Sequence, residues 1–275
     1  MNDEQLLPYQ RRKPKPSDLE LLSLGLTAEF LGMDSENDLS RKLPETISFK
    51  IERSVYNKRR RRLAGHLNAI RLRLASCFNG FEDCFVVDSM PLGICKLSRS
   101  SRSKVCRENA YSSPDKGYCA AQGSHYYGYK LHAVCSVNGV FQSMDLGPAS
   151  VHDINYLKDI KMQMSDCTVL GDKGYLSARW QLDLSDTCNI KPETPMRTNQ
   201  KGYRPQPFSL RKCRKRIETL FSQLCDQFMI GRNYAKTFEG SKTRIIAKVT
   251  ALTTVQYINR FIFGRNINNI KISIV

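Results

Sequence analysis

Three short segments of the chain each join a carboxylate to an apolar run, and they constrain the fold more than any other feature. Asp88 follows residues 84–87 in CFVVDSMP, and Asp172 follows residues 168–170 in TVLGDKGY. Both runs are rich in β-branched or aromatic residues and lack polar alternation, which predicts strands buried on both faces of a sheet. A proline or glycine follows within a few residues, so each carboxylate should lie at the carboxyl end of its strand. In an open α/β sheet that edge is where ligands bind.

The third carboxylate, Glu218, belongs to a helical pattern in RKRIETLFSQL. It lies about 100° around the helix from Ile217, at the rim of an apolar stripe. A helix packed on the sheet would therefore hold Glu218 toward the two strand ends. The stripe continues at helical spacing through Leu220, Phe221, Leu224 and Phe228.

Three carboxylates at one edge suit phosphodiester chemistry. Two divalent ions about 4 Å apart can activate the attacking oxygen and stabilise the leaving oxygen. Hard ions such as magnesium prefer oxygen ligands, and without a metal the carboxylates would repel one another. Any one of these acids alone is most simply an exposed residue. Their shared position at the ends of elements favours a metal site.

The charge of the chain indicates a polyanionic partner. Lys and Arg number 43 against 26 Asp and Glu, which gives a net charge of +17 and a pI near 9.5. Such a balance is typical of proteins that bind nucleic acid. No apolar run approaches membrane-spanning length, and residues 1–4 do not resemble the start of a signal peptide. We therefore expect a cytoplasmic protein.

The ten cysteines do not indicate a disulfide framework or a zinc finger. No Cys-x-x-Cys pair and no Cys/His cluster at finger spacing occurs. We expect reduced residues that fill apolar positions. A structural zinc held by Cys95, Cys106 and Cys119 is the alternative.

A small helical, basic region is predicted over residues 1–80. Ser17 with Glu20 predicts the start of one helix, and a further helical stretch runs from about residue 51 to residue 74. This stretch contains the basic run Arg59, Arg60, Arg61 and Arg62. Helices with such a run are compatible with a helix-turn-helix-like DNA-binding module. Alternatively, the run is a solvated face that touches phosphates without reading sequence.

An α/β domain is predicted over residues 81–263, with a tail of little motif content at 264–275. Residues 90–124 should form a long loop rich in Ser, Arg and Lys, which either grips a DNA backbone or is mobile. An alternating strand follows, with Lys130 and His132 on one face. Asn138-Gly139 predicts a type I′ hairpin turn into the next strand. A helix, the second buried strand and a later helix complete the order.

This order of elements and acids resembles the DDE transposases of bacterial insertion sequences, and more narrowly the insertion sequence 982 family. The motifs VDSMP, GYKLHAV, SVHD, LGDKGY and RIETLFSQL are similar to those of the family, and RKPKPSDLELL and RRRRL are similar to its amino-terminal region. The resemblance covers about residues 13–263.

The resemblance implies an α/β fold of the RNase H-like type, with a mixed sheet flanked by helices. It also implies that Asp88, Asp172 and Glu218 form a catalytic triad that binds two magnesium ions, or manganese in their place. The expected activity is that of a bacterial transposase that binds terminal inverted repeats, cuts a strand and transfers it to target DNA. A homodimer or larger oligomer is expected on DNA, because two element ends must meet. Besides the basic run, DNA contacts are expected from Arg99, Arg102, Lys130, His132, Lys173, Arg211 and Arg214.

One position departs from the wider DDE pattern. Many insertion-sequence transposases have a Lys or Arg two helical turns after the Glu, where this chain has Cys225. Arg214 and Arg211 instead precede Glu218 by one and two turns on the same flank. Contact with the DNA end is therefore expected from upstream of Glu218.

Two alternatives stay open from the sequence. The first is a catalytically silent DNA-binding protein derived from a transposase, against which the unbroken triad argues. The second is a nuclease that uses His125, His132 and His152 as bases or metal ligands. No second histidine stands at zinc-site spacing, which disfavours this alternative.

Overall fold

The computed structural model describes residues 6–8, 14–44, 51–78, 82–200 and 202–271. Residues 1–4 and the basic residues 11–13, which entered the sequence predictions, lie outside the described residues. The chain divides into two compact units. One unit comprises residues 1–74, 105–108 and 223–275, and the other comprises residues 75–104 and 109–222.

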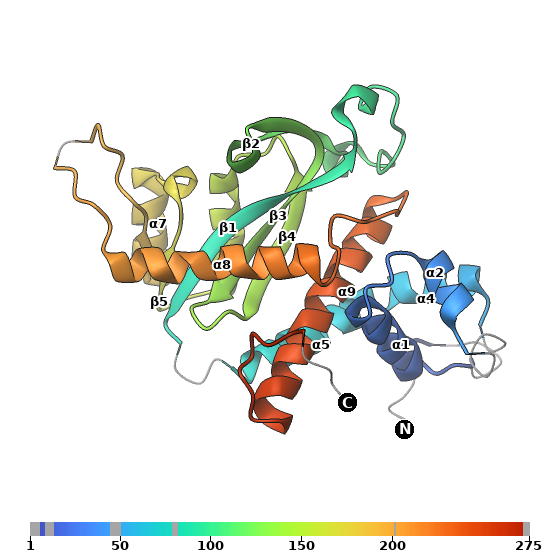
Figure 1. Ribbon diagram of the computed structural model, residues 1–275. Helices are drawn as coiled ribbons and strands as arrows, with labels where there is room; N and C mark the ends of the chain where they lie inside the picture. Colours follow the sequence, from blue (N-terminus) through green and yellow to red (C-terminus); the bar gives the residue numbers. More distant parts are fainter. Residues whose placement is uncertain (1–5, 9–13, 45–50, 79–81, 201, 272–275) are drawn as a thin grey trace. The chain divides into compact units, whose positions relative to one another are not determined.

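The first unit is helical (Figure 1). Ser17 forms a capping box with Glu20 at the start of α1, as the sequence predicts. The predicted stretch from residue 51 to 74 is two helices separated at Leu63. The helices of this unit are α1 (Asp18–Phe30), α2 (Glu36–Lys42), α4 (Arg53–Arg62), α5 (Ala64–Ser76, to residue 74) and α9 (Phe238–Tyr257), which continues as a π-helix at Ile258–Ile262.

Α mixed, six-stranded sheet forms the second unit, with strand order β2-β3-β1-β5-β6 and β4 paired to β3. The strands are β1 (Cys84–Cys95), β2 (Asp115–Cys119), β3 (Ser124–Ser136), β4 (Phe141–Pro148), β5 (Cys167–Leu170) and β6 (Ile190–Glu193). Figure 1 shows the curl of this sheet and the helices beside it. The curled mixed sheet with flanking helices confirms the expected α/β class and is consistent with an RNase H-like fold.

The two buried strands predicted from the sequence are neighbours and run parallel. Cys84, Phe85 and Val86 of β1 pair with Thr168, Val169 and Leu170 of β5. β1 then continues to Cys95 and pairs with β3 alone. Because β5 stops while β1 runs on, the sheet opens on one side of β1 beyond Val86.

The two faces of the sheet pack against different helices. Alternate residues of a strand point to opposite faces, and Phe85 and Val87 contribute to a core with α6 (Leu157–Gln163) and α7 (Ala178–Cys188). On the other face, Phe141 of β4 stacks on Phe221 of α8 (Phe208–Asp226), with ring centroids 6.1 Å apart. Asp88 is on this second face by alternation with Val87.

Helix α8 buries the apolar stripe that the sequence predicts. Ile217, Leu220 and Leu224 are at most 1% exposed. Arg211, Arg214 and Glu218 belong to the same helix. The stripe therefore fixes the rotation of α8 about its own axis, and with it the direction of the polar residues at its rim.

Three expectations differ from the structure. Residues 90–124 are not one loop, because β1 extends to Cys95 and β2 occupies Asp115–Cys119. The predicted domain of residues 81–263 includes residues 238–257, which form α9 of the helical unit and contact α1 and α4. The hairpin turn is not type I′, which needs a positive φ at both central residues. Of the two, only Gly139 has a positive φ, at 96°, and its N–H donates to Ser136 O. These features are those of a three-residue hairpin loop with a left-handed glycine.

Within the described residues, no helix combines the length and the apolar character needed to cross a membrane.

Candidate active site

Asp88 and Asp172 come together at the point where the parallel pairing ends. The last pair joins Val86 of β1 to Leu170 of β5. Asp88 stands two residues after Val86, and Asp172 stands two residues after Leu170. The shared register therefore brings both carboxylates to the opening of the sheet beyond β5, which is the edge predicted from the sequence.

Asp88 is held in an environment that disfavours its charge. Burial raises its pKa to about 7, and the carboxylates of Asp172 and Asp153 raise it as well. The backbone N–H of Ser89, which donates to Asp88 Oδ1 at 2.8 Å, and the guanidinium of Arg214 act in the opposite direction. A concentration of negative charge around a half-buried carboxylate is an environment that a bound cation would stabilise.

Asp172 is fixed by the turn that follows β5. Its Oδ1 accepts a hydrogen bond from Gly174 N at 2.7 Å and so caps the 3₁₀ helix Lys173–Tyr175. A short polar side chain that bonds the backbone two residues ahead is a common turn device. This turn directs the chain away from the sheet immediately after the carboxylate.

A further aspartate, Asp153, lies at the same opening. It begins the 3₁₀ helix Asp153–Tyr156, and its Oδ1 accepts hydrogen bonds from Ser89 Oγ at 2.9 Å and from Lys130 Nζ at 3.1 Å. The sequence predictions did not include Asp153 among the site residues. The SVHD motif contains it, so the signal was present, but only the fold shows that Ser89 and Lys130 reach it.

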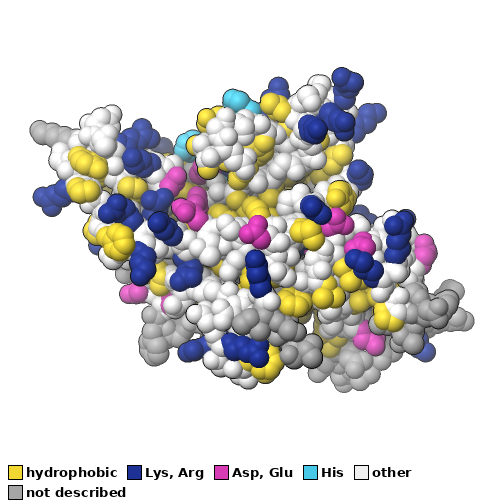
Figure 2. Space-filling view, viewed as in Figure 1, with side chains coloured by type: hydrophobic (Ala, Val, Ile, Leu, Met, Phe, Trp, Pro, Cys, Tyr) yellow, Lys and Arg dark blue, Asp and Glu magenta, His cyan; other side chains and the backbone are white. Residues whose placement is uncertain are grey.

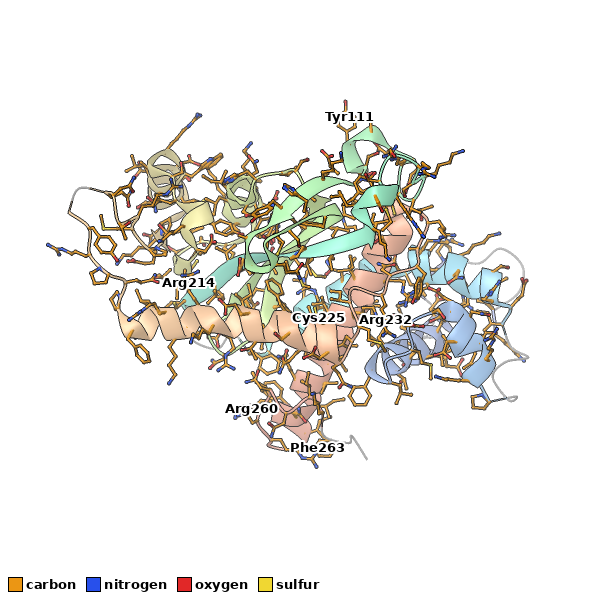
Figure 3. The ribbon with its side chains drawn as sticks, turned by 45° about the horizontal axis from the view of Figure 1, so that its top comes forward. Tyr111, Arg214, Cys225, Arg232, Arg260 and Phe263 are labelled. Carbon is orange, nitrogen blue, oxygen red and sulfur yellow. The ribbon has the colours of Figure 1, made fainter. Side chains whose placement is uncertain are left out.

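Arg214 of α8 is a positive charge that acts on this group of acids. Its charge lowers the pKa of Asp88, and Glu218 follows it by one helical turn on the same flank. Glu218 itself is exposed. Figure 3 shows Arg214 near one end of α8 and Cys225 near the other, so the residue at the family's usual basic position lies far along the helix from Arg214.

The family model described as "Transposase DDE domain" matches residues 79–254, which is more than half of the chain. The chain belongs to this family. No curated protein matches it.

The donor set of this DDE domain fits a hard divalent cation in its chemistry. Carboxylate oxygens are the ligands that magnesium prefers, and the field of Asp172 and Asp153 on Asp88 is one that a cation would relieve. Within the described residues, however, no three His, Cys, Asp or Glu side chains are close enough to enclose a metal as they stand. Completion of a site would therefore need a movement of side chains.

Lys130 and His132, predicted as DNA contacts, face into the protein. Lys130 Nζ bonds Asp153 and also Val151 O at 3.0 Å. His132 is 4% exposed and stacks on Tyr156, with ring centroids 5.2 Å apart. Lys130 is bonded inside the protein and His132 is buried against Tyr156, so we no longer assign these two residues to phosphate binding.

The basic run on α4 divides into buried and exposed halves. Arg59 pairs with Asp18, and Arg60 pairs with Glu29 and Glu36. These two guanidinium groups hold the helical unit together and are withdrawn as phosphate contacts. Arg61 and Arg62 are exposed.

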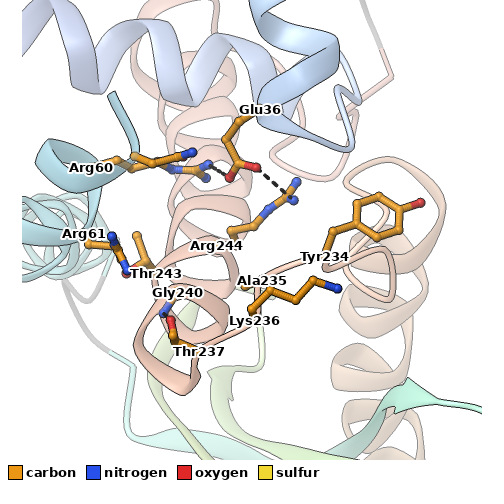
Figure 4. A pocket seen from close by; sticks show the side chains of 11 residues that line it. Glu36, Arg60, Arg61, Tyr234, Ala235, Lys236, Thr237, Gly240, Thr243 and Arg244 are labelled. Atoms are coloured by element: carbon orange, nitrogen blue, oxygen red, sulfur yellow. Dashed lines mark hydrogen bonds and ion pairs between the residues drawn. The ribbon is translucent and has the colours of Figure 1, made fainter. Parts of the chain in front are cut away.

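Arg61 lines a cavity of about 270 Å³ in the helical unit, shown in Figure 4. Lys236 and Arg244 also line it, and Glu36 is its carboxylate. Arg244 is buried and lies 3.9 Å from Glu36, so Glu36 balances part of the positive charge at this cavity.

The remaining Lys and Arg residues that were predicted to contact DNA are accessible to solvent, apart from the partly buried Arg214. Figure 2 shows Lys and Arg side chains scattered over much of the face in view. The exposed residues of the predicted set in the α/β unit are Arg99, Arg102, Lys173 and Arg211, with Arg214 partly buried.

The histidines do not gather. His125 is exposed beside Tyr118, and His152 Nδ1 accepts a hydrogen bond from Ile154 N at 3.2 Å, which caps the 3₁₀ helix that Asp153 begins. His132 is buried on the sheet. Their separate structural environments give the histidine-based nuclease no support.

Proposed function

We propose that this DDE-domain protein is an insertion-sequence transposase, of the insertion sequence 982 type, that binds the terminal inverted repeats of its element. It cuts a strand at the element end to expose a 3′-hydroxyl and joins that hydroxyl to target DNA. Asp88, Asp172 and Glu218 would hold two magnesium ions, or manganese. The ions would supply an activated attacking oxygen and stabilise the leaving oxygen.

The relationship between Asp88 and Asp172 carries the proposal. Two carboxylates from adjacent parallel strands stand at equal register past the last paired residues, and the surrounding acids oppose the charge of Asp88. A merely structural pair of acids would gain nothing from this proximity, because like charges repel. A cation between them makes the arrangement favourable.

The chain's own residues would position the DNA. Arg214, on the flank of α8 that acts on Asp88, is suited to a phosphate next to the scissile bond. The exposed Arg99, Arg102, Lys173 and Arg211 would contact the backbone around it. Such contacts orient a duplex without reading its sequence. A dimer or larger assembly would bring two element ends together.

A catalytically silent DNA-binding protein is the second candidate. The exposed Glu218 and the lack of an enclosed three-residue metal group among the described residues favour it over an enzyme with a preformed site. The two candidates share DNA binding and differ in strand cutting.

The deciding experiment uses the DNA that flanks the gene, with its inverted repeats, and the full chain. We expect cutting at the element end in the presence of Mg²⁺ or Mn²⁺, no cutting with EDTA, and no cutting by Asp172→Asn. Binding of the same DNA without cutting in any metal would establish the silent candidate.

A further inference from the structure

The two carboxylate oxygens of Asp153 have different surroundings: Oδ1 accepts hydrogen bonds, and Oδ2 lies near Gly174. Oδ1 receives Ser89 Oγ and Lys130 Nζ and lies 3.8 Å from His132 Nδ1. Oδ2 lies on the side of Gly174: a methyl group added to Gly174 would stand 3.7 Å from Asp153 Oδ2 and 2.9 Å from Asp172 Oδ1. Asp153 Oδ2 and the oxygen of Asp172 that accepts the Gly174 N–H therefore lie on the same side of this glycine.

Two buried polar groups at this place have no hydrogen-bond partner within the described part of the chain. The hydroxyl of Tyr175 is one, although its side chain is 98% buried. The carboxylates that act on it are Asp153, Asp88 and Asp172. The second is Nδ1 of the buried His132, beside Asp153. Buried polar groups are nearly always satisfied, so an unpaired phenol among three acids indicates a missing component.

We propose that Asp153 is a further metal-facing carboxylate of the active site, and that its Oδ2 binds the divalent cation held by Asp172. The inference rests on the proposed function, since it concerns the same cation. The contacts of Oδ1 fix the orientation of the carboxylate, as second-sphere hydrogen bonds do for metal ligands in general. With the cation bound, the hydroxyl of Tyr175 would be available to donate a hydrogen bond to one of its ligands.

A purely structural Asp–Lys pair explains less of the geometry. Lys130 accounts for one oxygen of Asp153 and leaves the other near Asp172, where a bare carboxylate would be repelled. The unit contains a pair of that simple kind, in which Lys161 Nζ contacts both oxygens of Asp183 at 2.9 Å. Asp183 uses its whole carboxylate for its lysine, and Asp153 does not.

The test is Mn²⁺ binding to the full chain without DNA, followed by electron paramagnetic resonance of the free ion. Asp153→Asn keeps the shape of the side chain and removes the ligand charge. We expect it to weaken Mn²⁺ binding by about 10-fold or more, the scale seen when groups around a metal are removed. Asp183→Asn is the matched control, because it removes an equal charge from an Asp–Lys pair elsewhere in the unit, and it should bind like the wild type.

Asp88→Asn and Asp172→Asn separate the inference from the proposed function. If both lose Mn²⁺ binding while Asp153→Asn keeps it, the role of Asp153 is refuted and the proposed function stands. If none of the three changes binding, there is no cation at this opening and the proposed function fails with it.

Asp153→Glu decides the question if the asparagine variant does not fold. It keeps the charge and can still pair with Lys130, but the longer side chain moves the carboxylate relative to Asp172. Weakened Mn²⁺ binding with unchanged thermal stability would support direct binding. Wild-type affinity would reduce Asp153 to the partner of Lys130 and overturn the inference.

Discussion

Asp88 and Asp172 each stand two residues beyond the last parallel pair of the sheet, Val86 and Leu170. β5 ends at that pair, while β1 continues along β3. Asp88 is consequently inside a long strand and Asp172 begins a turn, yet both reach the same opening. The equal offset places the candidate site at the one position where β1 loses its parallel neighbour.

Replacement of Glu218 tests the third member of the predicted triad. Glu218→Gln preserves shape and helix propensity but removes the charge, so strand cutting should fall below detection while DNA binding stays close to wild type. Asp226→Asn, at the end of α8, is the control and should cut normally. Gel assays of binding and cutting on one substrate give both results.

Full cutting by Glu218→Gln would move the third ligand elsewhere. Glu193 is then the first residue to examine, because it ends β6 and pairs with Leu170 of β5. It stands near the same edge of the sheet, although in the structure it forms an ion pair with Lys191 at 3.2 Å.

Arg214 should matter for cutting, in contrast to its neighbour Lys212. Arg214→Gln removes the guanidinium that stabilises the charged form of Asp88, so the pKa of Asp88 should rise further and cutting should decrease at neutral pH. Lys212 is exposed about 200° away around α8. Lys212→Gln should leave the cutting rate within about twofold of wild type, because exposed charges contribute little to one another. Equal losses for the two variants would contradict a specific role of Arg214.

Adjacent arginines of α4 should respond in opposite ways. Arg60→Ala leaves the buried Glu29 without one of its partners, so it should lower the free energy of unfolding by about 3–5 kcal/mol. Arg61→Ala should leave stability nearly unchanged. If Arg61 contacts a phosphate, the slope of log affinity against log salt should decrease by about 0.9. Thermal unfolding and DNA binding at several salt concentrations measure both effects. If the affinity of the wild type did not depend on salt, the positive charge of the chain would not be the cause of DNA binding.

The raised pKa of Asp88 should make the stability of the protein depend on pH. Its pKa is raised from 3.8 to about 7, so the folded state holds this proton more tightly than the unfolded chain. In the absence of metal, the contribution is fully present below about pH 4 and is lost as the pH rises through about 7. Asp88→Asn should remove this loss and be more stable than wild type at pH 8, by at most about 4 kcal/mol. Chemical denaturation in EDTA at pH 5 and pH 8 measures it, and Asp183→Asn, at a half-buried aspartate paired with Lys161, should not show the effect.

The local elements followed from the sequence because their signals lie within a few residues. The apolar runs before Asp88 and Asp172 form the predicted strands, and the stripe from Ile217 to Leu224 is buried as predicted. The capping box at Ser17 is also confirmed. Each depends on periodicity or on a contact over three or four residues, which a sequence states directly.

Tertiary structure decided which charged groups are available, because pairing over long sequence distances has no local signature. Arg59 and Arg61 look alike in the basic run, yet Asp18 pairs with Arg59, 41 residues away, while Arg61 is exposed. Asp153 is 64 residues from Ser89 and joins the site only because β1 and the 3₁₀ helix after β4 meet at the opening of the sheet. The sequence by itself determined the acids and the strands that carry them. Burial and register, which depend on how the whole chain packs, determined which of its charges face one another.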